Sequence, residues 1–286
     1  MLFRSFVEFE VPGDSPAGRG LRLLASGWIY PTDSSINVAI GQGGRIRPMG
    51  LSLEAQAPGG RWSVVNADLG FPAGKNKTIV VDLSAAAEAR RFRLRTNLEI
   101  YWDTLELATA VAAPLRTVKL QPARAELRYR GFSETTSPRA ESPETPHYDR
   151  IATRSQRWRD LVGYHTRFGD VKELLAGVDD RYVIMNAGDE LRMLFAEQPA
   201  PADGWRRDFV LIGDGWEKDG DYNTGFSQTV LPLPSHDKPA YGAGVTSVEL
   251  EDDPVYRRHR EDWQRYHTRY ITPGAFVGGL RTTRTN

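Results

Sequence analysis

The sequence contains no cysteine, which excludes disulfide bonds, thiolate catalysis and zinc sites with cysteine ligands. It also lacks an excess of either charge, because 37 Lys and Arg residues are matched by 37 Asp and Glu residues. No net field therefore draws the chain to nucleic acid or to an anionic membrane, and we expect no nucleic-acid partner. A partner, whether a protein or a glycan, has to be recognised by local features of the surface.

Long apolar runs are missing as well. The longest mildly apolar stretch, residues 105–115, contains Glu106 and Pro114 and is far shorter than the ~20 residues that a membrane-spanning helix needs. We therefore expect no membrane span. The first ten residues alternate polar and apolar side chains and do not show the uninterrupted apolar stretch of a secretory signal. The residues alone leave the localisation open.

What the sequence has in plenty is short extended segments between turn-forming Gly, Pro, Asn and Asp residues. This pattern predicts an all-β fold of one or two β-sandwich domains of the jelly-roll kind. The strands expected in the first 130 residues are 3–11, 21–30, 36–40, 62–66, 77–83, 91–95, 98–107, 115–120 and 125–130.

A change of composition divides the chain. Residues 133–147 are rich in Ser, Thr, Glu and Pro, and we expect a linker or a long surface loop there. The division predicts an N-terminal β-sandwich domain over residues 1–132 and a second β-rich domain over residues 148–286. In the second domain we expect strands over 181–186, 190–196 and 208–212.

Two helices are expected in the second domain. Asp170 and Glu173 have the spacing of a capping box, and with Gly177 they predict a short helix near 170–176. Asp253 and Pro254 suit the N-cap and first turn of a C-terminal amphipathic helix near 254–270. The aromatic residues of that helix recur at helical spacing and are expected to face the core: Tyr256, His259, Trp263, Tyr266 and Tyr270.

The densest polar segment covers residues 213–224. Its alternation of Asp219, Asp221 and Asn223 is typical of the opening of a calcium-binding loop, although the residues that follow exclude an EF-hand. A calcium site of another kind, or a hydrogen-bonded loop between strands, are the two interpretations. The candidate metal ligands are Asp214, Asp219, Asp221 and Asn223, and calcium is the only cofactor that the residues suggest.

A candidate ligand surface begins on the expected strand over 98–107. Strand alternation places Glu99, Tyr101 and Asp103 on one face, where they could bind a carbohydrate. The two carboxylates are ~13 Å apart along the strand, beyond the separation of about 5–9.5 Å that glycoside hydrolysis uses. A solvated strand face is the alternative.

Trp216 and His236 complete the candidate ligand surface. His236 precedes Asp237 and could act as a base with that carboxylate as its orienting partner, but the sequence has no Gly-x-Ser-x-Gly elbow. A histidine in an ordinary loop is the alternative. We therefore predict no catalytic residue.

Four longer strings in the sequence, residues 27–38, 70–78, 93–103 and 214–224, resemble the C-terminal module of bacterial FG-GAP/VCBS-repeat proteins that carry an ASPIC/UnbV domain. The resemblance extends from Gly27 to Tyr270. It implies a β-rich module attached to exported propeller proteins, and it brings no catalytic residues with it. The propeller repeats themselves are not in this sequence.

These observations predict a non-catalytic binding or assembly module of an exported or cell-surface bacterial protein. One alternative is a hydrolase that acts on a glycan or an ester, with its residues gathered from distant loops. The other is a calcium-stabilised structural domain, for which residues 214–223 are the relevant segment.

Overall fold

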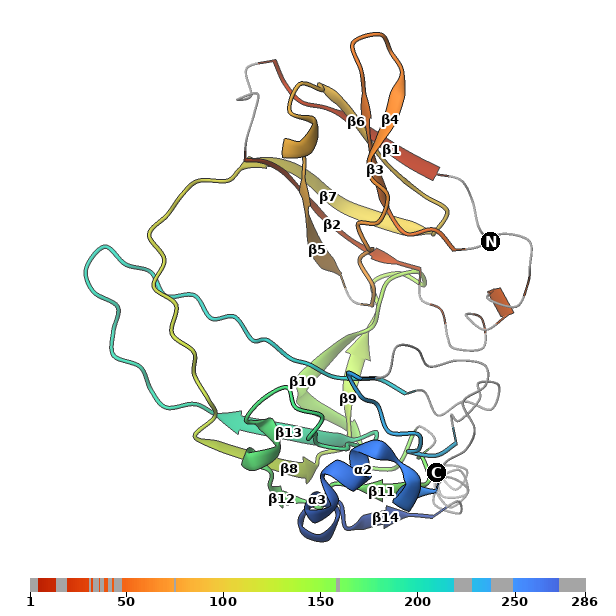
Figure 1. The fold of residues 1–286 in the computed structure, drawn as a ribbon, viewed down its shortest axis with the longest axis vertical. Coiled ribbons are helices and arrows are strands. Elements are labelled where there is room, and N and C mark those ends of the chain that lie inside the picture. The colour runs from red at the N-terminus through yellow and green to blue at the C-terminus, as the bar shows by residue number, and fades with distance from the viewer. Residues whose placement is uncertain are drawn as a thin grey trace. The chain divides into compact units, whose positions relative to one another are not determined.

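The computed structural model describes residues 5–13, 20–30, 32, 36, 39–40, 43, 48–74, 76–157, 160–218, 228–237 and 249–272. In this part of the chain most of the regular structure is β-strand in several antiparallel sheets, with two short α-helices, so the all-β prediction is confirmed (Figure 1). The chain divides into two compact units. The first contains Met1–Arg116 and Thr135–His147, and the second contains Thr117–Glu134 and Tyr148–Asn286.

The first unit contains two antiparallel sheets (Figure 1). The three-stranded sheet has the order β5 (Lys77–Asp82), β2 (Leu21–Ile29) and β7 (Ile100–Thr109). The four-stranded sheet has the order β1 (Ser5–Glu10), β6 (Arg91–Thr96), β3 (Ser52–Gln56) and β4 (Trp62–Asn66).

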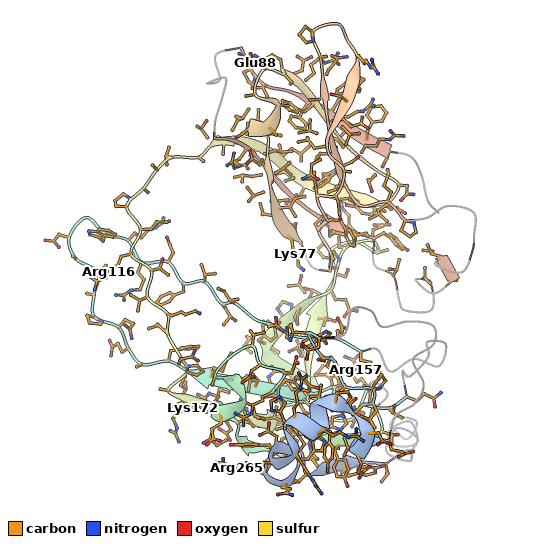
Figure 2. All side chains as sticks on the ribbon, viewed as in Figure 1. Lys77, Glu88, Arg116, Arg157, Lys172 and Arg265 are labelled. Atoms are coloured by element: carbon orange, nitrogen blue, oxygen red, sulfur yellow. The ribbon has the colours of Figure 1, made fainter. Side chains whose placement is uncertain are left out.

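Both sheets contribute to one hydrophobic core. Every second residue of β2 is buried, as the alternation of a half-buried strand requires, and Leu23 of this strand packs in the same cluster as Leu53 and Phe92 of the other sheet. Figure 2 shows the side chains of the two sheets between the ribbons. A β-sandwich requires such a shared core. The sandwich itself stays a prediction.

The second unit is built from smaller sheets. β8 (Arg124–Tyr129) lies between β12 (Gly169–Asp170) and β13 (Asp189–Leu194), and β11 (Gly163–His165) pairs with β14 (Arg269–Ile271). One hydrophobic cluster surrounds Leu127 and Leu174, and another surrounds Leu233, Val255 and Trp263.

Three expected strands are wrong. Residues 115–120 are irregular, since Pro114 and Pro122 flank them and Leu115 is exposed to solvent. Residues 181–186 form no ladder: the Ile184 carbonyl accepts a hydrogen bond from the Thr166 amide, but the Ile184 amide donates to the Thr166 side chain. Residues 208–212 form no strand and make no backbone hydrogen bond to another described residue. A strand was also expected over 36–40, but the described residues of that range, Ile36, Ala39 and Ile40, are helical, and the other two lie outside the described residues.

Of the strands that were not expected, β3 is the one that contains a buried carboxylate. β3 has no β-branched residue, and Glu54 within it is buried, which contradicts the usual alternation of a strand. Arg93 and Arg95 on the neighbouring β6 neutralise this carboxylate by ion pairs. The burial of Glu54 therefore depends on a contact that local sequence does not reveal.

Residues 133–147, expected as a linker or long surface loop, contain regular structure instead. β9 (Phe132–Thr136) and β10 (Thr145–Thr153) form a two-stranded sheet, which leaves residues 137–144 as the loop between them. Backbone pairing does not require large apolar side chains, so a composition rich in Ser, Thr and Glu did not prevent it.

Both predicted helices are corrected. The segment near 170–176 is a 3₁₀ turn over Lys172–Leu175, and Glu173 bonds Arg265 and Tyr266 rather than closing a capping box. The helix near 254–270 is two helices, α2 (Pro254–Arg258) and α3 (Arg260–Arg265), because the backbone at His259 leaves the helical region, with φ −122° and ψ 37°.

Other features of the C-terminal prediction are confirmed. The Asp253 side chain accepts a hydrogen bond from the Val255 amide, and Pro254 occupies the first turn. Trp263 and Tyr266 are buried, whereas Tyr270 lies on β14 and is exposed.

Candidate functional site

Asp180 is the centre of a polar cluster in the second unit. Its side chain is 7% exposed, and its φ of 60° lies in the left-handed region, which Asp tolerates better than most residues. The carboxylate accepts hydrogen bonds from Ser235 Oγ at 3.1 Å, from the His236 amide at 3.1 Å and from Arg258 at 2.9 Å. Burial would raise the pKa of Asp180, but the hydrogen bonds from His236 and Ser235 outweigh it and lower that pKa.

His236 lies between two carboxylates. Its Nδ1 is 2.6 Å from Asp180 Oδ1, and its Nε2 is 3.3 Å from Asp214 Oδ1. The hydrogen bond with Asp180 is the main reason why the pKa of His236 is raised, and Asp214 adds to it. Trp216 packs edge to face against the imidazole, with ring centroids 4.6 Å apart. A protonated His236 therefore ties the segment of Asp214 and Trp216 to the loop that carries Asp180.

The predicted partner of His236 is corrected. Asp237, its neighbour in sequence, instead forms an ion pair with Arg258 at the end of α2, and Asp180 takes the orienting position. Of the candidate residues in this unit, the structure brings Asp214, Trp216 and His236 together. Asp180 was not among the candidate residues predicted from the sequence. Locally it is only one more polar residue after the bend at Gly177–Asp179.

This cluster has the chemistry of an ion-pair network. A Ser–His–Asp triad needs a hydroxyl at the histidine nitrogen that does not face the aspartate. Here Nε2 of His236 faces the carboxylate of Asp214, and Ser235 directs its hydroxyl to Asp180. The arrangement can hold a proton between two carboxylates, and it joins segments distant in sequence.

The cluster predicts a pH dependence of stability. The pKa of His236 is raised in the folded chain above its ordinary value of 6.5, so its contribution is fully present below pH 6.5 and is lost as the pH rises through the folded pKa. We expect the urea midpoint of unfolding to fall between about pH 6 and about pH 8.5. His236→Gln should remove most of this fall, because the variant has no titrating group between the two carboxylates.

His147→Gln is the matched control. His147 lies in the first unit, so its replacement should leave the pH dependence of stability unchanged.

Two buried histidines change the stability with pH in the opposite direction. Burial lowers the pKa of His165, and it lowers that of His267 to about 4, so both destabilise the fold only when the pH falls below 6.5. An unchanged fall in the His236→Gln variant would contradict the assignment.

The candidate calcium site is only partly described. Asp219, Asp221 and Asn223 lie outside the described residues, whereas Asp214 contacts His236. In the described part of the chain no three carboxylate or histidine side chains are arranged to hold a metal ion. The calcium site therefore stays a prediction.

The remaining candidate residues lie on the first unit. The Tyr101 hydroxyl donates to Glu99 Oε1 at 2.6 Å, and this bond raises the pKa of Tyr101 to about 12. The Tyr101 ring stacks on Trp28, with centroids 5.7 Å apart. Because Trp28 and Tyr101 stack on each other, one face of each ring is covered and is not free to bind a sugar. Asp103 is exposed where the β2–β7 register shifts.

The chain was compared with known proteins. No family model, curated protein or solved structure matches it. None of the helices in the described part of the chain combines the length and the apolarity needed to cross a bilayer.

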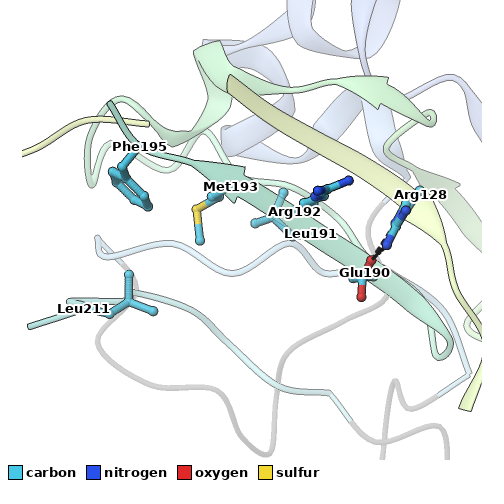
Figure 3. Close-up of a pocket in the computed structure, with 7 residues that line it drawn as sticks. All are labelled: Arg128, Glu190, Leu191, Arg192, Met193, Phe195 and Leu211. Atoms are coloured by element: carbon cyan, nitrogen blue, oxygen red, sulfur yellow. Dashed lines mark hydrogen bonds and ion pairs between the residues drawn. The ribbon is translucent and has the colours of Figure 1, made fainter. Parts of the chain in front are cut away.

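An exposed apolar segment lies beyond β13 in the second unit. Residues 205–214, which we call the arm, follow the irregular segment after β13. The arm contains four consecutive apolar residues that are 75–85% exposed, Phe209, Val210, Leu211 and Ile212. Figure 3 shows Leu211 across a hollow of about 400 Å³ from Met193 and Phe195.

Proposed function

We propose that the chain is a non-catalytic binding or assembly module of an exported or cell-surface bacterial protein, and that the arm binds a protein partner. The observation that carries this proposal is the exposure of four consecutive large apolar side chains, Phe209–Ile212. Soluble proteins scatter single apolar residues over the surface, whereas contiguous patches mark interaction sites.

The energetics favour a partner for this segment. Burial of one such side chain contributes about 1.5–3 kcal/mol relative to leaving it exposed. The exposed residues occur in sequence without interruption, which is the pattern of a strand buried on both faces. A partner that covers both faces of the arm would therefore bury several of these side chains, and the burial of each would stabilise the complex.

The backbone of the arm supports a protein rather than a glycan as the partner. No backbone hydrogen bond joins residues 206–213 to another residue in the part of the chain that the structure describes. An extended segment with free amides and carbonyls can pair with a strand of another protein. Sugars bind mainly to aromatic faces and polar groups, which the four central residues of the arm offer only at Phe209.

The exported or cell-surface part of the proposal is supported by the resemblance to modules of FG-GAP/VCBS-repeat proteins. The binding or assembly part is supported independently by the arm.

Site-specific photo-crosslinking tests the proposal. Phe209 is replaced by p-benzoylphenylalanine, which keeps an aromatic ring at that position, and the protein is irradiated in the cells that produce it. We expect crosslinked protein species of higher mass, because the arm is covered by a partner there.

The control places the same photoreactive residue at Tyr148, which is also an exposed aromatic residue. Crosslinks at Phe209 that are absent at Tyr148 support a partner at the arm. Equal crosslinking at both positions, or none at Phe209, would reject it.

A further inference from the structure

We infer that the partner of the arm is a second copy of this chain, and that two arms pair as antiparallel strands about a two-fold axis at Val210. This inference rests on the proposed function, since it identifies the partner of the same surface. It is carried by the order of charged and apolar residues along the arm.

Two-fold symmetry restricts the register of such a pair. When two copies of one strand pair antiparallel, the two-fold axis that relates them is perpendicular to the sheet. One residue then lies opposite its own copy, and the two side chains are on the same face of the sheet. The residues before it oppose the residues after it in the second copy. The sum of two opposing residue numbers must therefore be even. Four registers are centred on a residue of the apolar part of the arm, Phe209–Ile212. A centre at Ile212 leaves Val210 opposite Asp214 and Leu211 opposite Gly213, so three registers, centred on Phe209, Val210 or Leu211, are compared.

The register centred on Val210 is the most favourable, although it also leaves Asp208 opposite Ile212. It places Arg206 opposite Asp214 of the second copy and Phe209 opposite Leu211, each twice by symmetry. The apolar face of the pair then contains both copies of Phe209 and Leu211. Arg206 is available for this ion pair, because its side chain is 85% exposed and its contact with Asp208 is a surface one. Asp214 also contacts His236, but its side chain is 43% exposed, and a carboxylate can accept from both groups.

The other two registers are unfavourable. A centre at Leu211 places Asp208 opposite Asp214, so two pairs of like charges oppose each other. A centre at Phe209 places Arg206 opposite Ile212 and Arg207 opposite Leu211, which covers two apolar side chains with cations. Charge complementarity therefore selects one register, and that register is self-complementary.

Closure of the arm on its own chain is the competing arrangement. Leu211 faces the edge strand β13 across the hollow that Met193 and Phe195 line (Figure 3). Suppose that the arm paired with β13 as an antiparallel strand, with Leu211 opposite Met193. Asp214 would then lie opposite Glu190. Because Glu190 already forms ion pairs with Arg128 and Arg130, this contact contributes little, and the experiment below distinguishes the two arrangements.

Sedimentation velocity of the purified chain tests the inference, over about 1 μM to about 1 mM because interfaces smaller than about 1,200 Å² are weak. We expect a reversible monomer–dimer equilibrium. Val210→Lys places two cations opposite each other and should raise the dimer dissociation constant tenfold or more. Leu115→Lys is the matched control, because Leu115 is 87% exposed but lies outside the arm, and it should leave the dimer unchanged.

A charge exchange tests the register. Arg206→Asp alone and Asp214→Arg alone each create two like-charge pairs, so each variant should dimerise at least tenfold more weakly. An equimolar mixture of the two variants restores both opposite-charge pairs and should form heterodimers. Far-ultraviolet circular dichroism of each variant checks that the β structure is retained.

Several outcomes overturn the inference. A chain that stays monomeric throughout, a dimer that survives Val210→Lys, or a mixture that does not recover would each do so. Monomers whose melting temperature falls with Val210→Lys would show closure of the arm on its own chain. Crosslinks from Phe209 to a different protein, together with a monomeric purified chain, would reject self-pairing and leave the proposed function intact.

Discussion

Asp180→Ala is expected to destabilise the second unit by about 2–3 kcal/mol. Removal of one partner from a buried ion pair costs about 3–5 kcal/mol when the remaining charge stays buried. Here His236 and Arg258 are each 42% exposed, so water can solvate them after the change, and the expected loss lies below that range. The new residue would also have to adopt the left-handed φ of 60°, which Ala tolerates less well than Asp.

Urea unfolding at about pH 5.5 measures this effect best. The pKa of Asp180 is lowered from its ordinary 3.8 and that of His236 is raised from 6.5, so between these values both groups are fully charged. Asp180→Asn is the control for the backbone, because Asn also tolerates a positive φ but carries no charge. If Asp180→Ala and Asp180→Asn lower the free energy of unfolding equally, the effect is due to the lost charge. If neither variant lowers it, the role given to Asp180 is contradicted.

The same cluster shows what local sequence can reveal about a site. Trp216 and His236 were recognised as candidates, and the structure places them in contact. The carboxylate that orients His236 was assigned to Asp237, the nearest in sequence, whereas Asp180 precedes it by 56 residues. No periodicity or spacing relates residues so far apart, since their contact depends on how the intervening segments fold.

The fold was predictable where strands alternate. β2 and β4 appear within one residue of their expected ends, because turn residues bound both strands and the side chains of β2 follow the period of two. β3 was missed because its buried Glu54 is balanced by Arg93 from a strand 39 residues away. Tertiary contacts overrode local pattern there.

The arm shows the opposite case. Residues 208–212 were expected to form a strand, since their side chains have high β-propensity and lie between polar residues. The propensity is present, but a strand also needs a partner for its backbone, and none lies beside this segment in the described part of the chain. The partner proposed for the arm would supply the backbone pairing that this segment lacks.

Phe92→Ala is expected to destabilise the first unit by about 3–5 kcal/mol, the largest effect that we predict for a single substitution. Phe92 is completely buried, lies on β6 between β1 and β3, and stacks on Phe9 with ring centroids 5.6 Å apart. Its removal leaves a cavity among side chains of both sheets. Such a cavity cannot collapse easily, because backbone hydrogen bonds hold the strands on either side.

Hydrogen exchange followed by mass spectrometry can locate this effect. Because the hydrophobic clusters of the two units share no residue, amides of β1 to β7 should lose protection in Phe92→Ala while those of β8 and β13 keep theirs. Val80→Ala is the matched control, since Val80 is on β5 of the same unit but is 64% exposed, and its effect should stay within about 0.5 kcal/mol. Equal loss of protection in both units would mean that they unfold as one cooperative body, and the division into separately stabilised units would then be wrong.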